Sequence, residues 1–308
     1  MGKNAIVVVG SIALDSVKTP YGEVKEALGG SATYFTLAAR LYAGVKLVGV
    51  VGRDFPKKYL ALLAEKNTIL EGLVTQDGKT FRWSGSYMDL NEAITHDTQL
   101  NVFADFNPSL PKSYLGDKFL FLANIHPLLQ EKVLHQASQF SVIAADTMNL
   151  WIKNYPNDLL RLYRNVHIVF LNDREARMLS GEESLIQAAR KISSHGPQWV
   201  IIKKGEHGVI AYHDKHFFSL PAYPIEKVID PTGAGDSFAG AFMGVLAKSG
   251  GLDTKTVLEA LRYATVTASF TVQDFSVEAL RKIDQRKLRS RLEKYMMYSG
   301  LAHSFTSL

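Results

Sequence analysis

The residues with the clearest chemical potential form one short string in the last third of the chain. It reads Asp230-Pro-Thr-Gly-Ala-Gly-Asp236, and SFAGAFMGVLA follows it as a run that predicts a closely packed helix. Gly233 and Gly235 free the backbone for unusual dihedral angles. A glycine turn that leads into a helix presents unpaired N–H groups and the positive end of the helix dipole, which together bind anions. A carboxylate in the first turn, such as Asp236, could take a proton from a hydroxyl that attacks a phosphate held there.

Polar side chains also stand where four successive apolar runs end. The runs FLFLA, VIAA, HIVFL and WVII are followed by Asn124, Asp146, Asn172 and Lys203. Each of these residues alone could simply begin a loop or cap a helix. Ligands of open α/β sheets bind outside the carboxyl ends of the strands. We therefore expect a polar cleft along one edge of a sheet.

Short apolar runs rich in Val, Ile and Phe alternate with helical patterns over most of the chain. Such near-continuous apolar strands are typical of a parallel sheet that is buried on both faces, and the alternation predicts an α/β fold. The predicted strands are Ala5–Val9, Leu47–Val51, Phe119–Ala123, Val142–Ala145, His167–Leu171 and Trp199–Lys203, and the predicted helices are 31–43, 56–67, 128–138 and 173–195, the last with a break at Ser180-Gly181.

Two segments break this alternation. Residues 12–17 alternate polar and apolar side chains, and residues 72–104 carry short strand-like runs with turn residues between them. We expect the second segment to form a few antiparallel strands beside the α/β body. A small sheet in that position could act as a lid that excludes water from a reaction site.

The string D-P-T-G-A-G-D-S-F resembles the C-terminal signature of the ribokinase-like (PfkB) carbohydrate and nucleoside kinases. Other segments resemble further motifs of this family in the same order along nearly the whole chain: VVVGSIALD, ALGGSATYFTLAARL, VKLVGVVGRDF, NDREA and KKGEHGVIAY. The resemblance implies an α/β, ribokinase-like three-layer α/β/α fold with a mostly parallel central sheet. It also implies a single kinase domain over residues 1–308, with a small β-sheet lid formed by about 12–28 and 72–104.

The resemblance implies an ATP-dependent phosphotransferase with a catalytic role for the signature. Asp236 would be the general base that activates the acceptor hydroxyl. The backbone N–H groups of Gly233, Ala234 and Gly235 would form the anion hole for the transferred phosphoryl group. The simpler interpretation, in which Asp236 only stabilises a helix start, does not explain the match of the full string.

Roles in binding are implied in the same way for matching residues elsewhere in the chain. Asp15, Gly29 and Gly30 would hold hydroxyl groups of the acceptor. ATP and Mg²⁺ are the implied cofactors, and the resemblance suggests K⁺ as well. The residues assigned to them are Asn172 and Glu175 for Mg²⁺ (Glu175 through water), Lys203 and Gly205 for the nucleotide, and Asp230 and Thr232 for a monovalent cation. Arg53 and Asp54 follow the Gly52 turn of the matching segment, and the resemblance gives them no defined role.

The chain departs from the family pattern at several positions. Tyr34 stands where many ribokinases have an asparagine that contacts sugar, which puts ribose itself in question and allows an aromatic wall. Pro231 stands where threonine is common, a substitution that we expect to be tolerated. Four lid residues could face the acceptor or pack inside the lid: Arg82, Trp83, Asn101 and Phe103.

The sequence alone does not decide which class of acceptor the kinase phosphorylates. The main hypothesis is a kinase that phosphorylates a hydroxyl of a small sugar, polyol or nucleoside. The aromatic residues favour an alternative acceptor, a nucleoside or a heterocyclic alcohol. A non-catalytic ligand sensor is the third hypothesis, although a sensor need not keep Asp236. The sequence contains no G-x-x-x-x-G-K-[ST] motif, which excludes a P-loop kinase.

Composition limits the partners. The 308 residues include no cysteine, which excludes disulfides and thiol catalysis and favours a reducing compartment. The formal charge of +5 equals that of residues 281–294 alone, a segment with helical spacing that we expect to be a helix with a solvated basic face. No long apolar run or signal-peptide pattern is present. We expect a cytoplasmic protein that binds no nucleic acid or membrane and that could form a homodimer through the lid.

Overall fold

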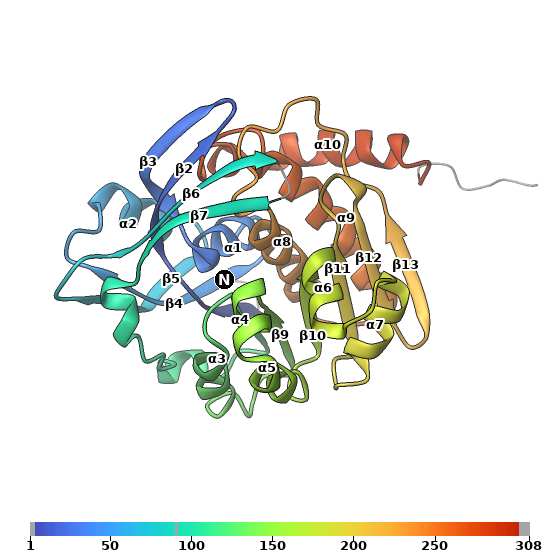
Figure 1. The fold of residues 1–308 in the computed structure, drawn as a ribbon, viewed down its shortest axis with the longest axis horizontal. Coiled ribbons are helices and arrows are strands. Elements are labelled where there is room, and N and C mark those ends of the chain that lie inside the picture. Colours follow the sequence, from blue (N-terminus) through green and yellow to red (C-terminus); the bar gives the residue numbers. More distant parts are fainter. Residues whose placement is uncertain (1–3, 90–91, 302–308) are drawn as a thin grey trace, which may run out of the picture.

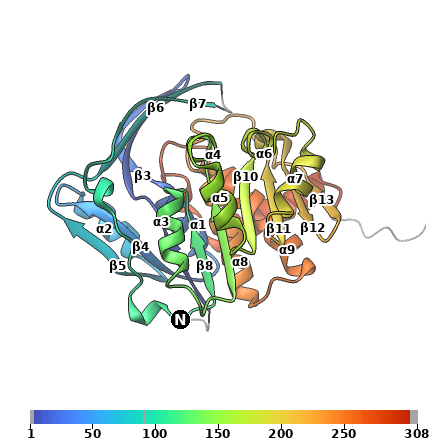
Figure 2. The ribbon, with the colours of Figure 1, turned by 60° about the horizontal axis from the view of Figure 1, so that its bottom comes forward.

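A nine-stranded sheet runs through the centre of the molecule (Figures 1 and 2). The computed structural model describes residues 4–89 and 92–301. The strands of this sheet are β1 (Ala5–Val9), β4 (Gly44–Gly52), β5 (Thr68–Gln76), β8 (Phe119–Leu122), β9 (Val142–Asp146), β10 (Ile168–Asn172), β11 (Trp199–Lys203), β12 (Val209–His213) and β13 (His216–Leu220). From β11 to β5 they pair in parallel in the order β11-β10-β9-β8-β1-β4-β5, and β12 and β13 extend the sheet antiparallel beyond β11.

Helices cover both faces of this sheet. They are α1 (Ser31–Ala39), α2 (Lys57–Ala64), α3 (Pro127–Leu134), α4 (Asn149–Asn154), α5 (Pro156–Tyr163), α6 (Asp173–Ser180), α7 (Leu185–Ser193), α8 (Ala234–Ser249), α9 (Thr254–Thr271) and α10 (Gln285–Tyr298). In β1, Ile6 and Val8 pack into the core beneath α1, α8 and α9, whereas Val7 and Val9 pack into the core beneath α3, α5 and α7. Side chains alternate between the faces of a strand, so the continuous apolar run serves two cores. The predicted three-layer α/β/α fold is confirmed.

A second sheet of four strands arches over one end of the first (Figure 2). Its strands are β2 (Ala13–Thr19), β3 (Gly22–Gly29), β6 (Phe81–Asp89) and β7 (Glu92–Gln99), in the order β3-β2-β6-β7. We call it the lid. The antiparallel strands expected within residues 72–104 are present as β6 and β7. The strands β2 and β3 also pair antiparallel, whereas β2 and β6 are parallel. The alternation of polar and apolar residues is the same in both kinds of pairing, so it does not distinguish them.

The lid boundaries in the structure differ from the predicted ranges of 12–28 and 72–104. Residues 68–76 form β5 in the large sheet, and a 3₁₀ turn at Asn101–Asp105 follows β7. Residues 1–3, 90–91 and 302–308 of the predicted domain lie outside the described residues. The predicted break in the helix at 173–195 is present, because Gly181 adopts a left-handed φ of 72° between α6 and α7.

The basic segment at 281–294 forms most of α10. Asp284 caps the helix by accepting a hydrogen bond from the Lys287 N–H at 2.7 Å, while Leu288 and Tyr295 are buried.

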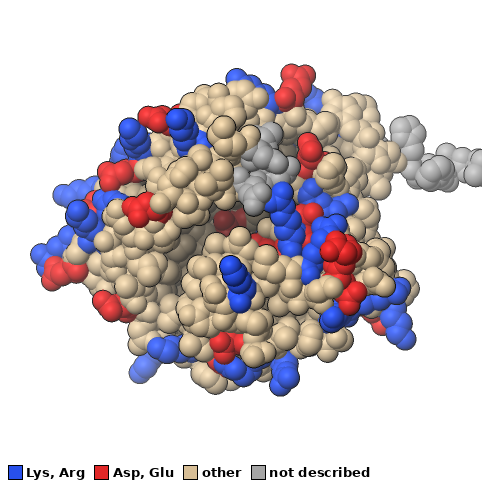
Figure 3. All heavy atoms as spheres, viewed as in Figure 1, with Lys and Arg blue, Asp and Glu red and all other residues tan. Residues whose placement is uncertain are grey.

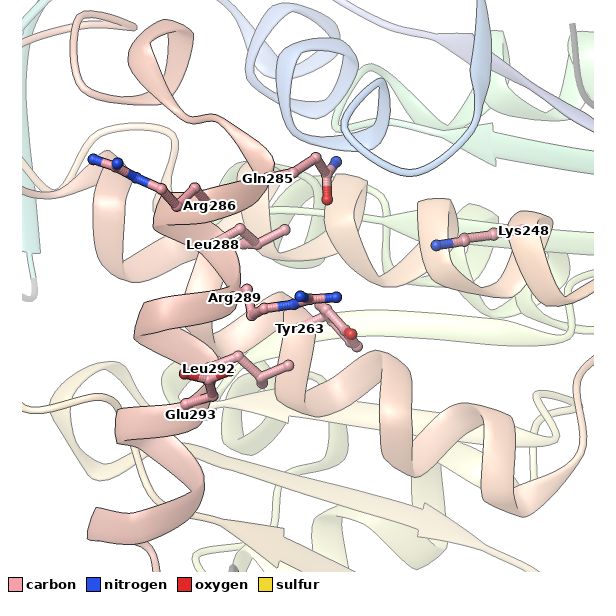
Figure 4. Close-up of a pocket in the computed structure, with 8 residues that line it drawn as sticks. All are labelled: Lys248, Tyr263, Gln285, Arg286, Leu288, Arg289, Leu292 and Glu293. Atoms are coloured by element: carbon pink, nitrogen blue, oxygen red, sulfur yellow. The ribbon is translucent and has the colours of Figure 1, made fainter.

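A groove of about 560 Å³ lies between α8, α9 and α10 (Figure 4). It includes Lys248 in the last turn of α8, at the opposite end of that helix from Gly233. None of the helices among residues 4–89 and 92–301 is both long enough and apolar enough to span a bilayer.

Candidate active site

The glycine turn before α8 carries the residues that are predicted to form the anion hole. Gly233 precedes the helix with a left-handed φ of 74°, which favours glycine. The Ala234 N–H donates to the Pro231 carbonyl at 3.2 Å and the Ser237 N–H donates to the Gly233 carbonyl at 2.8 Å. The Ala234 N–H predicted for the anion hole therefore already has an acceptor. Between these two bonded groups lie the Gly235 N–H and the Asp236 N–H, and the second of these donates to the carboxylate of Asp236 itself.

Asp236 is a carboxyl group whose pKa suits a general base. Its pKa is raised to about 7, mainly by burial and also by the nearby carboxylate of Asp146, while the ammonium group of Lys203 lowers it. A base with a pKa near the working pH is ionised often enough to accept a proton and basic enough to hold it. The environment of Asp236 is thus consistent with the predicted proton transfer.

Lys203 and Asp146 form an ion pair at the carboxyl ends of β11 and β9. The Lys203 Nζ lies 2.9 Å from Asp146 Oδ2, and the two side chains are 17% and 4% exposed. Burial lowers the pKa of Lys203, but Asp146 and Glu175 outweigh burial and raise it. A Cβ atom placed on Gly235 would lie 3.0 Å from the Lys203 Nζ. The ammonium group therefore lies against the first turn of α8.

Asn172 and Glu175 form a reciprocal cap at the start of α6. The Glu175 N–H donates to Asn172 Oδ1 at 2.8 Å, and the Asn172 N–H donates to Glu175 Oε2 at 2.7 Å. Burial raises the pKa of Glu175 to about 7, with Lys203 lowering it and Asp146 raising it. The strands that carry Lys203, Asn172 and Asp146 are neighbours in the sheet, so the structure places these side chains along one edge.

Magnesium fits this edge through oxygen ligands. Mg²⁺ prefers oxygen donors and usually keeps several waters, with one or two carboxylates and the phosphates of its substrate. Glu175 and Asp236 offer such carboxylates. No three acidic or histidine side chains converge as a metal cage anywhere in the described ranges. A magnesium ion here would depend mainly on nucleotide phosphates and water, and the contact of Glu175 through water stays a prediction.

Asp15 lies in β2 of the lid, beside the glycines predicted to act with it. A Cβ atom on Gly29 would lie 1.8 Å from Asp15 Oδ2, and the Gly30 N–H donates to the Asp15 carboxylate. Burial raises the pKa of Asp15 to about 7, the Gly30 N–H lowers it, and the carboxylates of Asp230 and Asp236 raise it. These electrostatic contacts place the predicted acceptor site and the signature turn in one region. Figure 3 shows acidic atoms at the bottom of a hollow between the lid and the body.

Asp230 organises the turn from the other side. Its Oδ1 accepts the Thr232 N–H at 2.9 Å and its Oδ2 accepts the Ser276 N–H at 3.2 Å. The Thr232 hydroxyl lies 3.4 Å from the Tyr87 hydroxyl, which comes from β6 of the lid. Asp230 thus joins the turn to the loop after α9, and Thr232 joins it to the lid. Gly205 begins a 3₁₀ turn after β11, two residues beyond Lys203.

The four lid residues that could have faced the acceptor differ in their surroundings. Trp83 pairs with Asp15 in the parallel β2–β6 ladder, so both side chains point to the same face of the lid. Phe103 stacks between other rings at the base of the lid, and Asn101 donates to the Thr80 carbonyl at 3.0 Å. Arg82 pairs with Glu26 and Asp54. Of these four side chains, Trp83 is therefore the candidate for acceptor contact.

Several residues near the site had no assigned role in the sequence analysis. Asp146 was noted only as a polar strand end. Asn124 Oδ1 accepts the Trp151 indole N–H at 2.9 Å, and the Asn124 carbonyl accepts a hydrogen bond from the Ser31 hydroxyl at 3.3 Å. The His126 ring lies 5.0 Å from the Trp151 ring and 4.3 Å from that of Tyr155. No sequence signal pointed to this aromatic group, because His126 precedes α3, whereas Trp151 lies in α4 and Tyr155 follows that helix.

Comparison with known proteins identifies the family. Residues 3–282 match the pfkB family of carbohydrate kinases, so the chain belongs to this family and is a kinase. A cytidine kinase of Thermococcus kodakarensis is 35% identical over 245 residues, which cover 77% of this chain and 87% of that relative. The nucleoside kinase of Methanocaldococcus jannaschii shares the fold with a TM-score of 0.75 at 22% identity, over 94% of this chain and 98% of the other. A putative ribokinase II from E. coli, solved with ATP and Mg²⁺, has a TM-score of 0.77 at 18% identity, over 94% and 99% of the two chains.

Proposed function

We propose that this kinase transfers the γ-phosphoryl group of ATP to a hydroxyl group of a nucleoside, with cytidine as the first acceptor to test. The observation that carries the proposal is the 35% identity to a cytidine kinase across 77% of the chain. The aromatic side chains around the predicted acceptor site favour an acceptor that carries a flat aromatic base. A free sugar offers only hydroxyl groups, whereas a nucleoside adds a flat base that aromatic side chains can stack against.

Two aromatic groups flank the residues predicted to bind the acceptor. Trp83 lies across the ladder from Asp15 on the lid. On the body, the Ser31 hydroxyl follows Gly30 and contacts Asn124, which in turn holds the indole of Trp151. The acceptor region is thus connected on one side to an indole of the lid and on the other to an indole of the body. We assign the base of the nucleoside to this aromatic region and its ribose to Asp15, Gly29 and Gly30.

The proposed reaction needs one proton acceptor and charge stabilisation. The acceptor hydroxyl gives its proton to Asp236 while its oxygen bonds to the γ-phosphorus. The bond between that phosphorus and the bridging oxygen of ADP breaks, and ADP keeps the electron pair. The Gly235 N–H and the positive end of the α8 dipole stabilise the charge on the phosphoryl oxygens. When bound, magnesium neutralises phosphate charge beside Glu175.

Further parts of the proposal concern a cation and an oligomer. We retain Asp230 and Thr232 as the predicted site of K⁺, and Gly205 as a residue beside the nucleotide. Burial raises the pKa of Asp230, and both of its carboxylate oxygens accept backbone N–H groups. A homodimer through the lid is proposed because β7 is an edge strand of the lid sheet. The ratio of activity with K⁺ to activity with Na⁺ and the mass in solution test these two parts.

The test of the acceptor is ADP release from Mg-ATP with cytidine, uridine, adenosine, inosine, ribose, fructose and inositol. The expected result is a kcat/KM for cytidine at least about tenfold above that for ribose, because the base adds contacts worth more than ~1.4 kcal/mol. Trp83→Leu should raise the KM of the nucleoside and leave the KM of ATP unchanged. A higher kcat/KM with a free sugar than with every nucleoside would overturn the proposal and assign the enzyme to sugars.

A further inference from the structure

The ion pair of Lys203 and Asp146 is the feature of the site that the proposed reaction leaves unexplained. Its ammonium group is 2.9 Å from Asp146 Oδ2 and lies against Gly235, in the turn that would bind the transferred group. Glu175 and Asp236 also act electrostatically on Lys203. One cation therefore stands among three carboxyl groups at the end of the sheet.

A purely structural role explains this arrangement poorly. Burying an ion pair costs desolvation energy that its Coulomb attraction only partly returns, so a sheltered pair is weak evidence of a stabilising purpose. Three carboxyl groups around one ammonium group leave an excess of negative charge where the phosphates of ATP, which are negative themselves, would bind. A cation placed at this point lowers the electrostatic cost of bringing the γ-phosphate to the first turn of α8.

We propose that Lys203 is a catalytic residue whose ammonium group binds the oxygens of the phosphoryl group during transfer, and that Asp146 is the residue that positions it. Phosphoryl transfer gains most from preorganised charge near the equatorial oxygens. The ammonium group and the Gly235 N–H of the α8 turn would both contact those oxygens. Lys203 donates hydrogen bonds and transfers no proton, while the acceptor's proton still goes to Asp236.

Asp146 is suited to hold the lysine in place. Its Oδ2 accepts from the Lys203 ammonium group, and its Oδ1 accepts the Thr147 N–H at 2.9 Å, which fixes the orientation of the carboxylate. Asp146 ends β9 and Lys203 ends β11, with β10 between them. Both anchors are therefore on strands of the rigid sheet, which allows the ammonium group to be placed accurately.

This inference rests on the proposed phosphoryl transfer but not on the identity of the acceptor. The experiment uses the full chain and whichever acceptor the parent phosphorylates best. If that acceptor is ribose, the nucleoside proposal fails while Lys203 can still be tested. A second measurement needs no acceptor turnover: calorimetric binding of Mg-ADP with and without aluminium fluoride, a mimic of the transferred phosphoryl group.

For Lys203→Met we expect kcat to fall at least about 100-fold, as for the loss of one preorganised donor. The dissociation constant of Mg-ADP should change less than about threefold, while the tighter binding that aluminium fluoride gives the parent should be lost. Lys203→Arg should recover part of both effects, because it keeps the charge. Asp146→Asn should slow kcat less, and the double variant should be no slower than Lys203→Met, since the two residues act as a unit.

The matched control is Lys46→Met. Lys46 pairs with Asp117 at 2.6 Å, with side chains 15% and 12% exposed, near the start of β4 and therefore at the opposite edge of the same sheet. Loss of that pair should lower the melting temperature and leave kcat unchanged. A folded Lys203→Met with kcat within about fivefold of the parent would overturn the proposal. So would equal losses of affinity for Mg-ADP with and without aluminium fluoride, which would indicate a structural role.

Discussion

The ring of Tyr34 lies directly against Gly233: a Cβ atom placed on Gly233 would be 2.3 Å from the Cγ and Cδ1 atoms of that ring. Tyr34 is 1% exposed and belongs to α1, the helix that follows the Gly-Gly motif. Contact between α1 and the signature turn therefore sets the distance between the predicted acceptor site and the predicted anion hole. The ring of Tyr34, which the sequence offered as an aromatic wall of the acceptor site, packs instead beneath the signature turn.

Gly233→Ala should disrupt the turn. A left-handed φ costs an alanine about 1–2 kcal/mol, and the collision with Tyr34 adds overpacking of about 1–3 kcal/mol. We expect a lower free energy of unfolding and, because the N–H groups of α8 are displaced, a kcat reduced by about 100-fold or more. Urea unfolding and ADP release measure the two effects. Gly116→Ala is the control, since a Cβ atom there meets nothing within 4 Å; equal behaviour of the two variants would refute the role of the contact.

Much of the site could be predicted from the sequence because the sheet is parallel. Runs that end in Asn124, Asp146, Asn172 and Lys203 must end at the same edge once their strands are parallel neighbours, which they are. The contacts of Tyr34 with Gly233 and of Tyr87 with Thr232 could not be predicted. They join positions far apart in the chain, and such pairs depend on how the helices and the lid pack and not on local pattern. The parallel pairing of β2 with β6 could not be predicted from the sequence for the same reason.

Asp236→Asn should separate catalysis from binding. Without a proton acceptor, kcat should fall by about 10²- to 10⁴-fold, while the affinity for Mg-ADP stays close to that of the parent. The measurement is steady-state ADP release together with calorimetric titration of Mg-ADP. Asp173→Asn, on the exposed first turn of α6, serves as the control and should retain the parent kcat. A turnover of Asp236→Asn within about tenfold of the parent would exclude Asp236 as the base.

The Asp236→Asn variant should be more stable than the parent at neutral and alkaline pH. The folded pKa of Asp236, about 7, lies above its ordinary value of 3.8, so the ionised form is disfavoured in the folded protein. This cost is absent below about pH 4, grows as the pH rises to about 7 and is constant above that. We expect the gain in melting temperature of Asp236→Asn to be largest above about pH 7 and to shrink as the pH falls. A gain that is independent of pH would contradict the raised pKa.

The rate should fall on the acid side of neutrality. Asp15 and Asp236 both have a pKa of about 7, raised mainly by burial. Each must be ionised, Asp15 to accept hydrogen bonds from acceptor hydroxyls and Asp236 to accept the proton, so protonation of either lowers kcat/KM for the acceptor. A profile between about pH 5 and about pH 9 should bend near pH 7 and approach a slope of two at its acid end. A profile that is flat down to about pH 5 would show that neither carboxyl group controls the reaction.

Asp54 joins the turn after β4 to the base of the lid. Its Oδ1 accepts from both the N–H and the hydroxyl of Thr80 at 2.7 Å, and its Oδ2 lies 2.8 Å from a guanidinium nitrogen of Arg82, the second residue of β6. Since β6 is paired with the strand of Asp15, these bonds help to fix the predicted acceptor site in place.

Asp54→Asn should therefore act on the acceptor more than on ATP. Hydrogen bonds to a charged group contribute about 1.5–3 kcal/mol when sheltered, and the 30% exposure of Asp54 reduces this to about the 1.4 kcal/mol that corresponds to a tenfold change. We expect the KM of the acceptor to rise by about tenfold, while the KM of ATP stays within about twofold. The control is Asp77→Asn, which removes the exposed partner of Arg53 in the same region. Equal increases in both KM values would mean that Asp54 does not act specifically on the acceptor through the lid.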